Sequence, residues 1–106
     1  MMNKIYGMLG LAMKAGKLAY GSDMCIEKIK RNETFLLIIS EDLSKNTKDK
    51  FIKLAEMYHI SIVVFGDITS ISQSIGKANK GVIAVLDEGF ANKISQMVNN
   101  FKGANN

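Results

Sequence analysis

Residues 14–31 hold the residue types that could bind an anion at the start of a helix. Gly16 can end a preceding helix, because glycine adopts the left-handed backbone conformation without Cβ strain. Gly21 allows a tight turn, Ser22 can accept a hydrogen bond as an N-cap, and Asp23 suits the first helical turn. The first N–H groups of a helix have no partner within it, and lysines lie close by in the sequence. We therefore expect this segment to receive phosphate or a similar anion.

The positive charge of the chain is concentrated in its first third. The 106 residues carry a formal net charge of +4. Residues 1–31 contain six lysines and arginines against two acids, whereas residues 32–106 contain eight of each. Four of these early cations flank the possible anion site, namely Lys14, Lys17, Lys28 and Arg31. Localised positive charge is typical of a surface that contacts nucleic acid, and chance clustering on a solvated face is the alternative.

No pattern in the chain predicts catalysis. Nothing resembles a nucleophile with a neighbouring general base. Cys25 stands near a helix start, which could lower its pKa, but a lone cysteine is more often a small buried residue. His59 has no cysteine or histidine partner in the sequence, which argues against a metal site. We therefore expect no enzymatic activity and no bound cofactor.

Acidic residues follow the three apolar runs that predict the long strands. They include Glu41, Asp42, Asp67 and Asp87. The carboxyl ends of parallel strands are where α/β proteins bind ligands, so these acids could hold Mg²⁺ or a nucleotide. Alternatively, each acid caps or favours the start of the following helix. We favour capping, because a helix is predicted directly after each of the three positions.

Apolar periodicity predicts alternating strands and helices in one domain over residues 1–102, with 103–106 as a frayed tail. Helices are expected at about 3–15, 23–31, 44–58, 70–75 and 87–101, and strands at about 17–20, 35–40, 60–65 and 82–86. The three longer strands are continuous apolar runs, typical of strands covered on both faces. The alternation favours parallel strands joined by right-handed crossovers. We therefore expect a three-layer α/β/α sandwich around a small mixed, mostly parallel four-stranded sheet.

The composition restricts the class of protein further. A hydrophobic content of 47% excludes a disordered chain, and no apolar run approaches the roughly 20 residues that span a membrane. The single cysteine cannot form an internal disulfide, which favours the cytoplasm. All five phenylalanines fall on expected core positions: Phe35, Phe51, Phe65, Phe90 and Phe101. An exposed aromatic platform that stacks single-stranded bases is therefore not expected.

Several short motifs together resemble the kink-turn RNA-binding ribosomal-protein superfamily. They occupy residues 10–21, 39–42, 44–47, 74–77 and 82–91. Each motif is weak alone, but their ordered combination is specific. The similarity covers roughly residues 5–98 and is greatest to the bacterial YlxQ-type branch, which is itself similar to the archaeal large-subunit kink-turn protein.

This resemblance implies a non-catalytic, monomeric protein that binds kinked RNA, such as ribosomal RNA or an mRNA leader, in association with the ribosome or translation. Three segments would dock on the RNA: the start of the second helix, the turn after the second strand, and the loop before the last strand. In the family, the first segment reads the sheared G·A pairs of the kink and the last packs on an extruded base. The expected contact residues are Lys14, Lys17, Gly21, Ser22, Asp23, Met24, Glu27, Lys28, Arg31, Glu41, Lys77, Ala78, Asn79 and Lys80.

Three positions in the first segment differ from the family's pattern. Well-characterised binders carry Asn or Lys, Glu or Gln, and Lys where this chain has Asp23, Met24 and Glu27. Ionised Asp cannot donate to a base edge, although it can accept from guanine amino groups, and Met forms no comparable hydrogen bond. Glu27 repels phosphate, and Lys28 and Arg31 could compensate from adjacent turns. A protein-interaction module that has kept the fold without the RNA site is therefore a further alternative.

Overall fold

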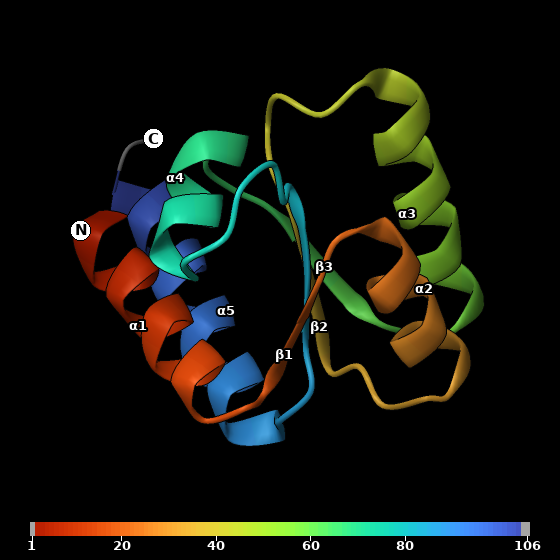
Figure 1. Cartoon of the computed structure of the whole chain (residues 1–106), viewed down its shortest axis with the longest axis horizontal. Coiled ribbons are helices and arrows are strands. Elements are labelled where there is room, and N and C mark those ends of the chain that lie inside the picture. The colour runs from red at the N-terminus through yellow and green to blue at the C-terminus, as the bar shows by residue number, and fades with distance from the viewer. Residues whose placement is uncertain (1, 105–106) are drawn as a thin grey trace.

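Within residues 2–104, which the structure describes, four short strands form one sheet and five helices cover its two faces (Figure 1). The architecture is seen in a computed structural model of the chain. The helices are α1 (Met2–Lys14), α2 (Ser22–Lys30), α3 (Lys45–Met57), α4 (Ile68–Ser74) and α5 (Glu88–Ala104). The strands are β1 (Leu18–Tyr20), β2 (Leu36–Ile39), β3 (Ser61–Val64) and β4 (Val82–Val85). The expected α/β/α sandwich around a mixed four-stranded sheet is confirmed.

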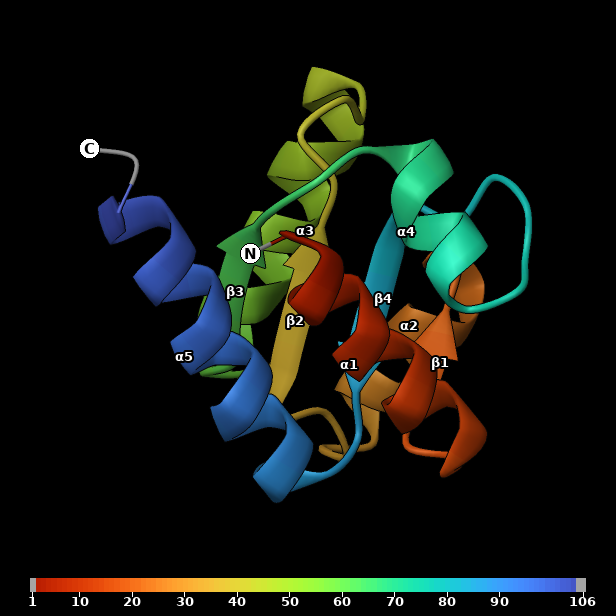
Figure 2. The same cartoon turned by 90° about the vertical axis from the view of Figure 1, so that its left-hand side faces the viewer.

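The sheet has the strand order β1-β4-β2-β3. Strands β2 and β3 are parallel, whereas β4 is antiparallel to both of its neighbours, β1 and β2. Strands β1, β2 and β3 therefore run in the same direction, and only the expectation of a parallel crossover into β4 is wrong. After α4 the returning chain stays beside that helix, where the Ser72 hydroxyl accepts from the Lys80 N–H at 2.7 Å and donates to the Lys80 carbonyl at 3.2 Å. Strand β4 then enters the sheet at the end where β3 leaves it (Figure 2).

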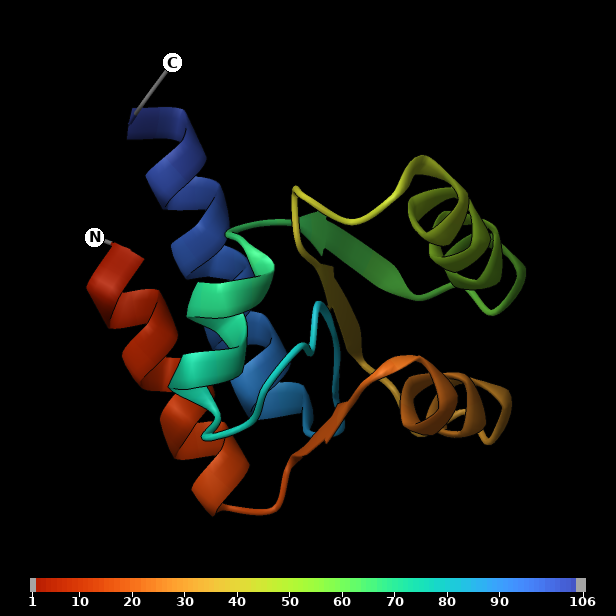
Figure 3. The same ribbon diagram turned by 45° about the horizontal axis from the view of Figure 1, so that its top comes forward.

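Alternate strand residues point into two separate cores, as the two-residue period of a strand requires. On one face, Leu36 and Ile38 pack with residues of α1, α4 and α5. On the other face, Leu37 and Ile39 pack with residues of α2 and α3 (Figure 3). Strand β2 is therefore covered on both faces, as its apolar run predicts. Strand β3 lies at the sheet edge and is only partly buried, so the same expectation is wrong for it.

The margins of two elements also differ from expectation. Phe35 precedes β2 and its side chain is 48% exposed, so its assignment to the core is wrong, whereas Phe51 and Phe65 are buried. Phe90 and Phe101 pack partly buried against the core. Helix α5 continues through Ala104, and residues 105–106 lie outside the described residues, so the frayed tail at 103–106 stays a prediction. Among the described helices, none has the length and apolar character needed to cross a membrane.

Several chain segments meet at one end of the sheet, which we call the loop end. There the Gly21 N–H donates to the Val82 carbonyl at 3.0 Å, and the Ser40 N–H donates to the Gly81 carbonyl at 2.9 Å. The opposite end of the sheet includes Lys17, whose carbonyl accepts from the Leu86 N–H at 2.8 Å. The loop end therefore gathers the start of α2, the turn after β2 and the loop before β4.

Candidate nucleic-acid interface

Helix α2 begins at the loop end without a side-chain cap. Gly21 occupies the N-cap position with φ 84° and ψ 159°, a conformation that favours glycine. The expectation that Ser22 is the N-cap is therefore wrong, because Ser22 is already the first helical residue. The Cys25 N–H donates to the Gly21 carbonyl at 3.1 Å and so begins the helical hydrogen-bond series. The preceding N–H groups, of the exposed residues Ser22, Asp23 and Met24, are left available to an outside acceptor.

The loop of residues 77–80 brings two lysines against the start of α2. A Cβ atom placed on Gly21 would lie 3.6 Å from both Cδ and Nζ of Lys80. The Lys77 Nζ lies 5.1 Å from the centre of the Tyr20 ring, which is a cation–π contact. Ammonium groups beside the positive end of a helix dipole attract phosphate. We call residues 20–24 together with residues 77–80 the helix-start corner.

A cavity of about 320 Å³ adjoins this corner between α4 and the loop. It is lined by Ile68, Thr69, Ser72, Gln73, Lys77, Ala78 and Asn79. Ile68 and Ala78 offer apolar walls, while Gln73 and Asn79 can hydrogen-bond. Such a lining suits a flat base that has left its stack. Tyr20, Ser72 and Gln73 are not among the residues that the sequence predicts for the site. They lie beside the loop of residues 77–80 because β4 runs antiparallel, so that this loop stays at the loop end of the sheet.

The turn after β2 packs directly on the same loop. A Cβ on Gly81 would lie 2.8 Å from Leu43 Cδ2 and 2.9 Å from Ser40 Oγ, so only glycine fits there. The exposed Glu41 accepts from the Lys48 ammonium through its carbonyl and donates its N–H to the Gly66 carbonyl at 2.8 Å. The three segments expected to dock on RNA are therefore neighbours in space. Glu41 adds negative charge at their border.

The other strand-end acids serve as helix caps. The Asp67 carboxylate accepts from the Ser70 N–H at 2.7 Å, and Asp42 accepts from the Ile68 N–H at 3.0 Å. Asp87 accepts from the Phe90 N–H at 2.9 Å. These bonds confirm the capping interpretation for Asp67 and Asp87. Asp42 instead caps α4, while Ser44 caps α3, the helix that follows Asp42.

The antiparallel course of β4 also separates these acids. Asp87 follows the end of β4, so it lies at the opposite end of the sheet from Asp42 and Asp67. Across residues 2–104, no group of three or more His, Cys, Asp or Glu side chains is placed to hold a metal ion. The geometry therefore gives no support to the alternative of a site for Mg²⁺ or a nucleotide.

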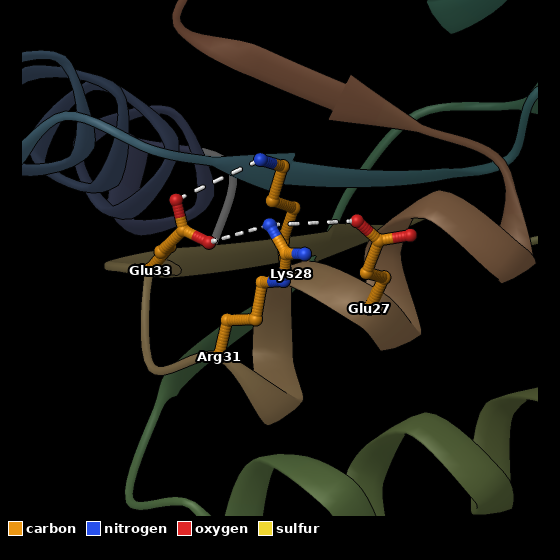
Figure 4. Close-up of polar contacts among 4 residues, drawn as sticks. All are labelled: Glu27, Lys28, Arg31 and Glu33. Atoms are coloured by element: carbon orange, nitrogen blue, oxygen red, sulfur yellow. Dashed lines mark ion pairs between the residues drawn. The ribbon is translucent and has the colours of Figure 1, made fainter.

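Lys28 and Arg31 lie toward the far end of α2 in an ion-pair network (Figure 4). The Lys28 Nζ is 3.6 Å from a Glu33 carboxylate oxygen, and the Arg31 guanidinium is 3.8 Å from Glu27 and 3.9 Å from Glu33. Arg31 is about 15 Å along the helix axis from Gly21. Their contact with RNA stays a prediction, and the ion pairs reduce the charge that they can offer to phosphate.

Lys14 and Lys17 also lie away from the helix-start corner. Lys17 precedes β1 and Gly21 follows it, so about 13 Å of extended chain separates the two. The positive charge of the first third therefore does not gather at the start of α2, contrary to expectation. Lys77 and Lys80, from much later in the chain, supply the cations there.

Cys25 is a buried structural residue rather than a reactive thiol. Its side chain is 0% exposed, and its Sγ lies 3.5 Å from the Val82 carbonyl oxygen. Burial raises the pKa of the Cys25 thiol to about 12. The interpretation of Cys25 as a small core residue is confirmed. His59 lies just after the C-terminal end of α3 and has a positive φ of 56°.

A mixed sheet between two helical layers, with an uncapped helix start beside a lysine-bearing loop, defines a small α/β/α protein with a site suited to anions. The chain belongs to the ribosomal protein L7Ae/L30e/S12e/Gadd45 family, whose model matches residues 3–95. The resemblance recognised in the motifs is thereby confirmed.

Two sequence relatives carry the name RNA-binding protein YlxQ. The protein of Enterococcus faecium is 33% identical over 95 residues, which cover 90% of this chain and 91% of the relative. The protein of Bacillus subtilis (strain 168) is 33% identical over 93 residues, which cover 88% of this chain and 93% of the relative. The expected likeness to the YlxQ-type branch is confirmed.

Two solved structures share the fold. A Bacillus halodurans C protein with unknown function superposes with a TM-score of 0.87 and 30% identity, covering 91% of this chain and 97% of that one. The Giardia lamblia 15.5kD RNA binding protein superposes with a TM-score of 0.75 at 11% identity, covering 96% of this chain and 88% of that one. At that low identity, the second likeness concerns the fold alone.

Proposed function

We propose that this protein binds structured RNA without catalysing a reaction, and that the RNA contains a sharp bend of the kink-turn type. Membership of the ribosomal-protein family and the names of the YlxQ relatives support RNA as the partner. The observation that carries the proposal is the position of the Lys80 side chain beside Gly21 at the uncapped start of α2. It combines free N–H donors and an ammonium group in one place.

A bent RNA is the form that this corner can use. A regular A-form duplex hides its base edges in a deep, narrow major groove, so sequence and shape are read where the duplex is interrupted. At a kink, the N–H groups of Ser22, Asp23 and Met24 can reach exposed acceptors, while Lys77 and Lys80 contact adjacent phosphates. The cavity beside α4 then receives an extruded base.

Several finer properties are part of the same proposal. The family includes ribosomal proteins, which supports association with the ribosome or with translation. The single cysteine is buried and reduced, which suits the cytoplasm. We propose that the protein acts as a monomer, since one copy contains the whole helix-start corner.

The experiment is a titration of fluorescently labelled kink-turn RNA, with a straight duplex of the same length and composition as the control. We expect the kink-turn RNA to bind at least about tenfold more tightly, a difference of about 1.4 kcal/mol. Equal affinities would indicate general phosphate binding and reject recognition of the bend. Failure to bind either RNA would favour the alternative of a protein-interaction module.

A further inference from the structure

A groove between α2 and α3 lies outside the RNA site and has an apolar floor edged by lysines. It has a volume of about 360 Å³ and is lined by Ile26, Lys30, Lys50, Lys53, Leu54 and Met57. Met57 is 69% exposed, which is unusual for a large apolar side chain. Figure 1 shows the two helices side by side on one face of the sheet.

The spacing of the lining residues makes the groove continuous. Those on α3 stand at positions i, i+3, i+4 and i+7, so they form one stripe along the outer surface of that helix. Ile26 and Lys30 stand four residues apart on α2 and form the facing wall. The stripe on α3 extends over about 10 Å, which is two helical turns.

The three groove lysines are not neutralised by acids of the protein. Among the described residues, the ion pairs join Lys28, Arg31 and Lys45 to acids, and none includes Lys30, Lys50 or Lys53. The acids next to the groove do not line it. Glu27 pairs with Arg31, and Asp49 pairs with Lys45. Glu56 is exposed beside Met57. The groove thus presents uncompensated positive charge around an apolar centre.

We propose that this groove binds an acidic amphipathic helix of another protein. An apolar stripe on that helix covers Leu54, Met57 and Ile26, and acidic residues beside the stripe pair with the three lysines. This is the helix-in-groove mode of recognition, in which apolar anchors provide affinity and charge selects the partner. Such an interaction is separate from RNA binding and does not depend on it.

The chemistry of the groove disfavours two other occupants. RNA phosphates would pair with the lysines but would leave the apolar floor without a partner. A second copy of this chain has a net charge of +4, so two copies repel each other overall. An acidic amphipathic helix satisfies both the floor and the rim.

The test uses the full chain and a labelled helical peptide of about five turns, roughly 18 residues, with a leucine stripe flanked by glutamates. We expect saturable binding by fluorescence anisotropy. Met57→Ser should weaken it at least about fivefold, and the double variant Lys50→Glu/Lys53→Glu at least about tenfold. Exposed matched controls on other helices, Leu11→Ser and the double variant Lys93→Glu/Lys102→Glu, should leave it unchanged. Circular dichroism should show that every variant is folded.

Three results would overturn the proposal. The first is the absence of saturable peptide binding. The second combines two observations: Met57→Ser does not affect peptide binding, and an RNA duplex binds as tightly as the peptide but no longer binds the variant Lys50→Glu/Lys53→Glu. This result would assign the groove to RNA. The third is self-association of the unmodified chain that Met57→Ser removes, since this would make a second copy the occupant.

Discussion

The ammonium group of Lys80 lies against the backbone of Gly21, 3.6 Å from the point where a Cβ on that glycine would stand. The two residues belong to segments that are distant in sequence and meet because the Gly21 N–H bonds Val82, two residues after Lys80. A lysine from the loop therefore adds its charge to the positive end of the α2 dipole. The positive charge of the helix-start corner therefore results from tertiary structure rather than from local sequence.

Replacing Lys80 should weaken RNA binding while the fold remains intact. Lys80→Ala removes an ammonium group from the start of α2, so we expect a loss of about five- to tenfold in affinity for kink-turn RNA. The slope of log affinity against log salt should fall in magnitude by about 1. Lys93→Ala, on α5, is the matched control and should change neither quantity. Equal effects of the two substitutions would show that only total charge matters.

Gly21 should be required for its backbone conformation. Gly21→Ala places a Cβ on a residue with φ 84°, and we expect it to lower the free energy of unfolding by about 1–3 kcal/mol. Gly7→Ala is the control, because a Cβ there meets nothing within 4 Å and lies inside α1. That substitution should stabilise the protein by about 0.5–1 kcal/mol. Urea unfolding measures both changes, and a tolerated Gly21→Ala would contradict the assigned backbone.

Ser72 should fix the position of the lysine-bearing loop. Its buried hydroxyl bonds both the N–H and the carbonyl of Lys80, so Ser72→Ala should cost about 1–3 kcal/mol of stability and speed hydrogen exchange at the Lys80 amide. Ser74→Ala is the control, because that hydroxyl bonds the Ile71 carbonyl of its own helix. If the Lys80 amide exchanged equally fast in both variants, the anchoring role would be excluded.

The buried thiol of Cys25 should make stability depend on pH in the alkaline range. Burial raises the pKa of this thiol from 9.0 to about 12, so above pH 9 it ionises in the unfolded chain before it ionises in the native one. Its contribution is complete below pH 9 and is lost as the pH rises from there toward 12. Relative to Cys25→Ala, the free energy of unfolding should fall by about 1.4 kcal/mol per pH unit in that window. Parallel pH profiles for the two proteins would mean that water reaches the native thiol.

Restoring the family's residues at the start of α2 should strengthen RNA binding. The triple variant Asp23→Asn, Met24→Glu and Glu27→Lys supplies a donor to base edges, an acceptor, and a cation in place of a repelling carboxylate. All three positions are exposed, so the fold should tolerate the changes. We expect at least about a tenfold gain in affinity for kink-turn RNA and less gain for a straight duplex. A loss of affinity would show that this chain reads a different RNA feature.

The sequence predicts the elements of this fold better than their arrangement. Apolar periodicity places all the helices and strands, because burial on one or two faces leaves a direct pattern in the residues. The direction of β4 leaves no such pattern, since an apolar run reads the same for parallel and antiparallel pairing. It follows from where the chain returns to the sheet after α4, and two hydrogen bonds between Ser72 and Lys80 hold the returning chain beside that helix.

The candidate site shows the same limit. The three docking segments were predicted from the family resemblance, and the fold brings them to one end of the sheet. The clustered charges of residues 1–31 were misleading, because β1 carries Lys17 away from Gly21 and ion pairs engage Arg31. The polar pattern indicates Ser22 as the N-cap, whereas the helix starts one residue earlier because Gly21, with its positive φ, occupies the N-cap position.

The most direct test is to follow the amide chemical shifts of Ser22, Asp23 and Met24 by two-dimensional NMR while kink-turn RNA is added. We predict that these amides and those of residues 77–80 shift most, because their N–H groups or side chains meet the RNA. Amides near Lys14 and Lys17, and those lining the groove between α2 and α3, should shift least. Changes confined to either of those regions, with none at the start of α2, would contradict RNA docking at the helix-start corner.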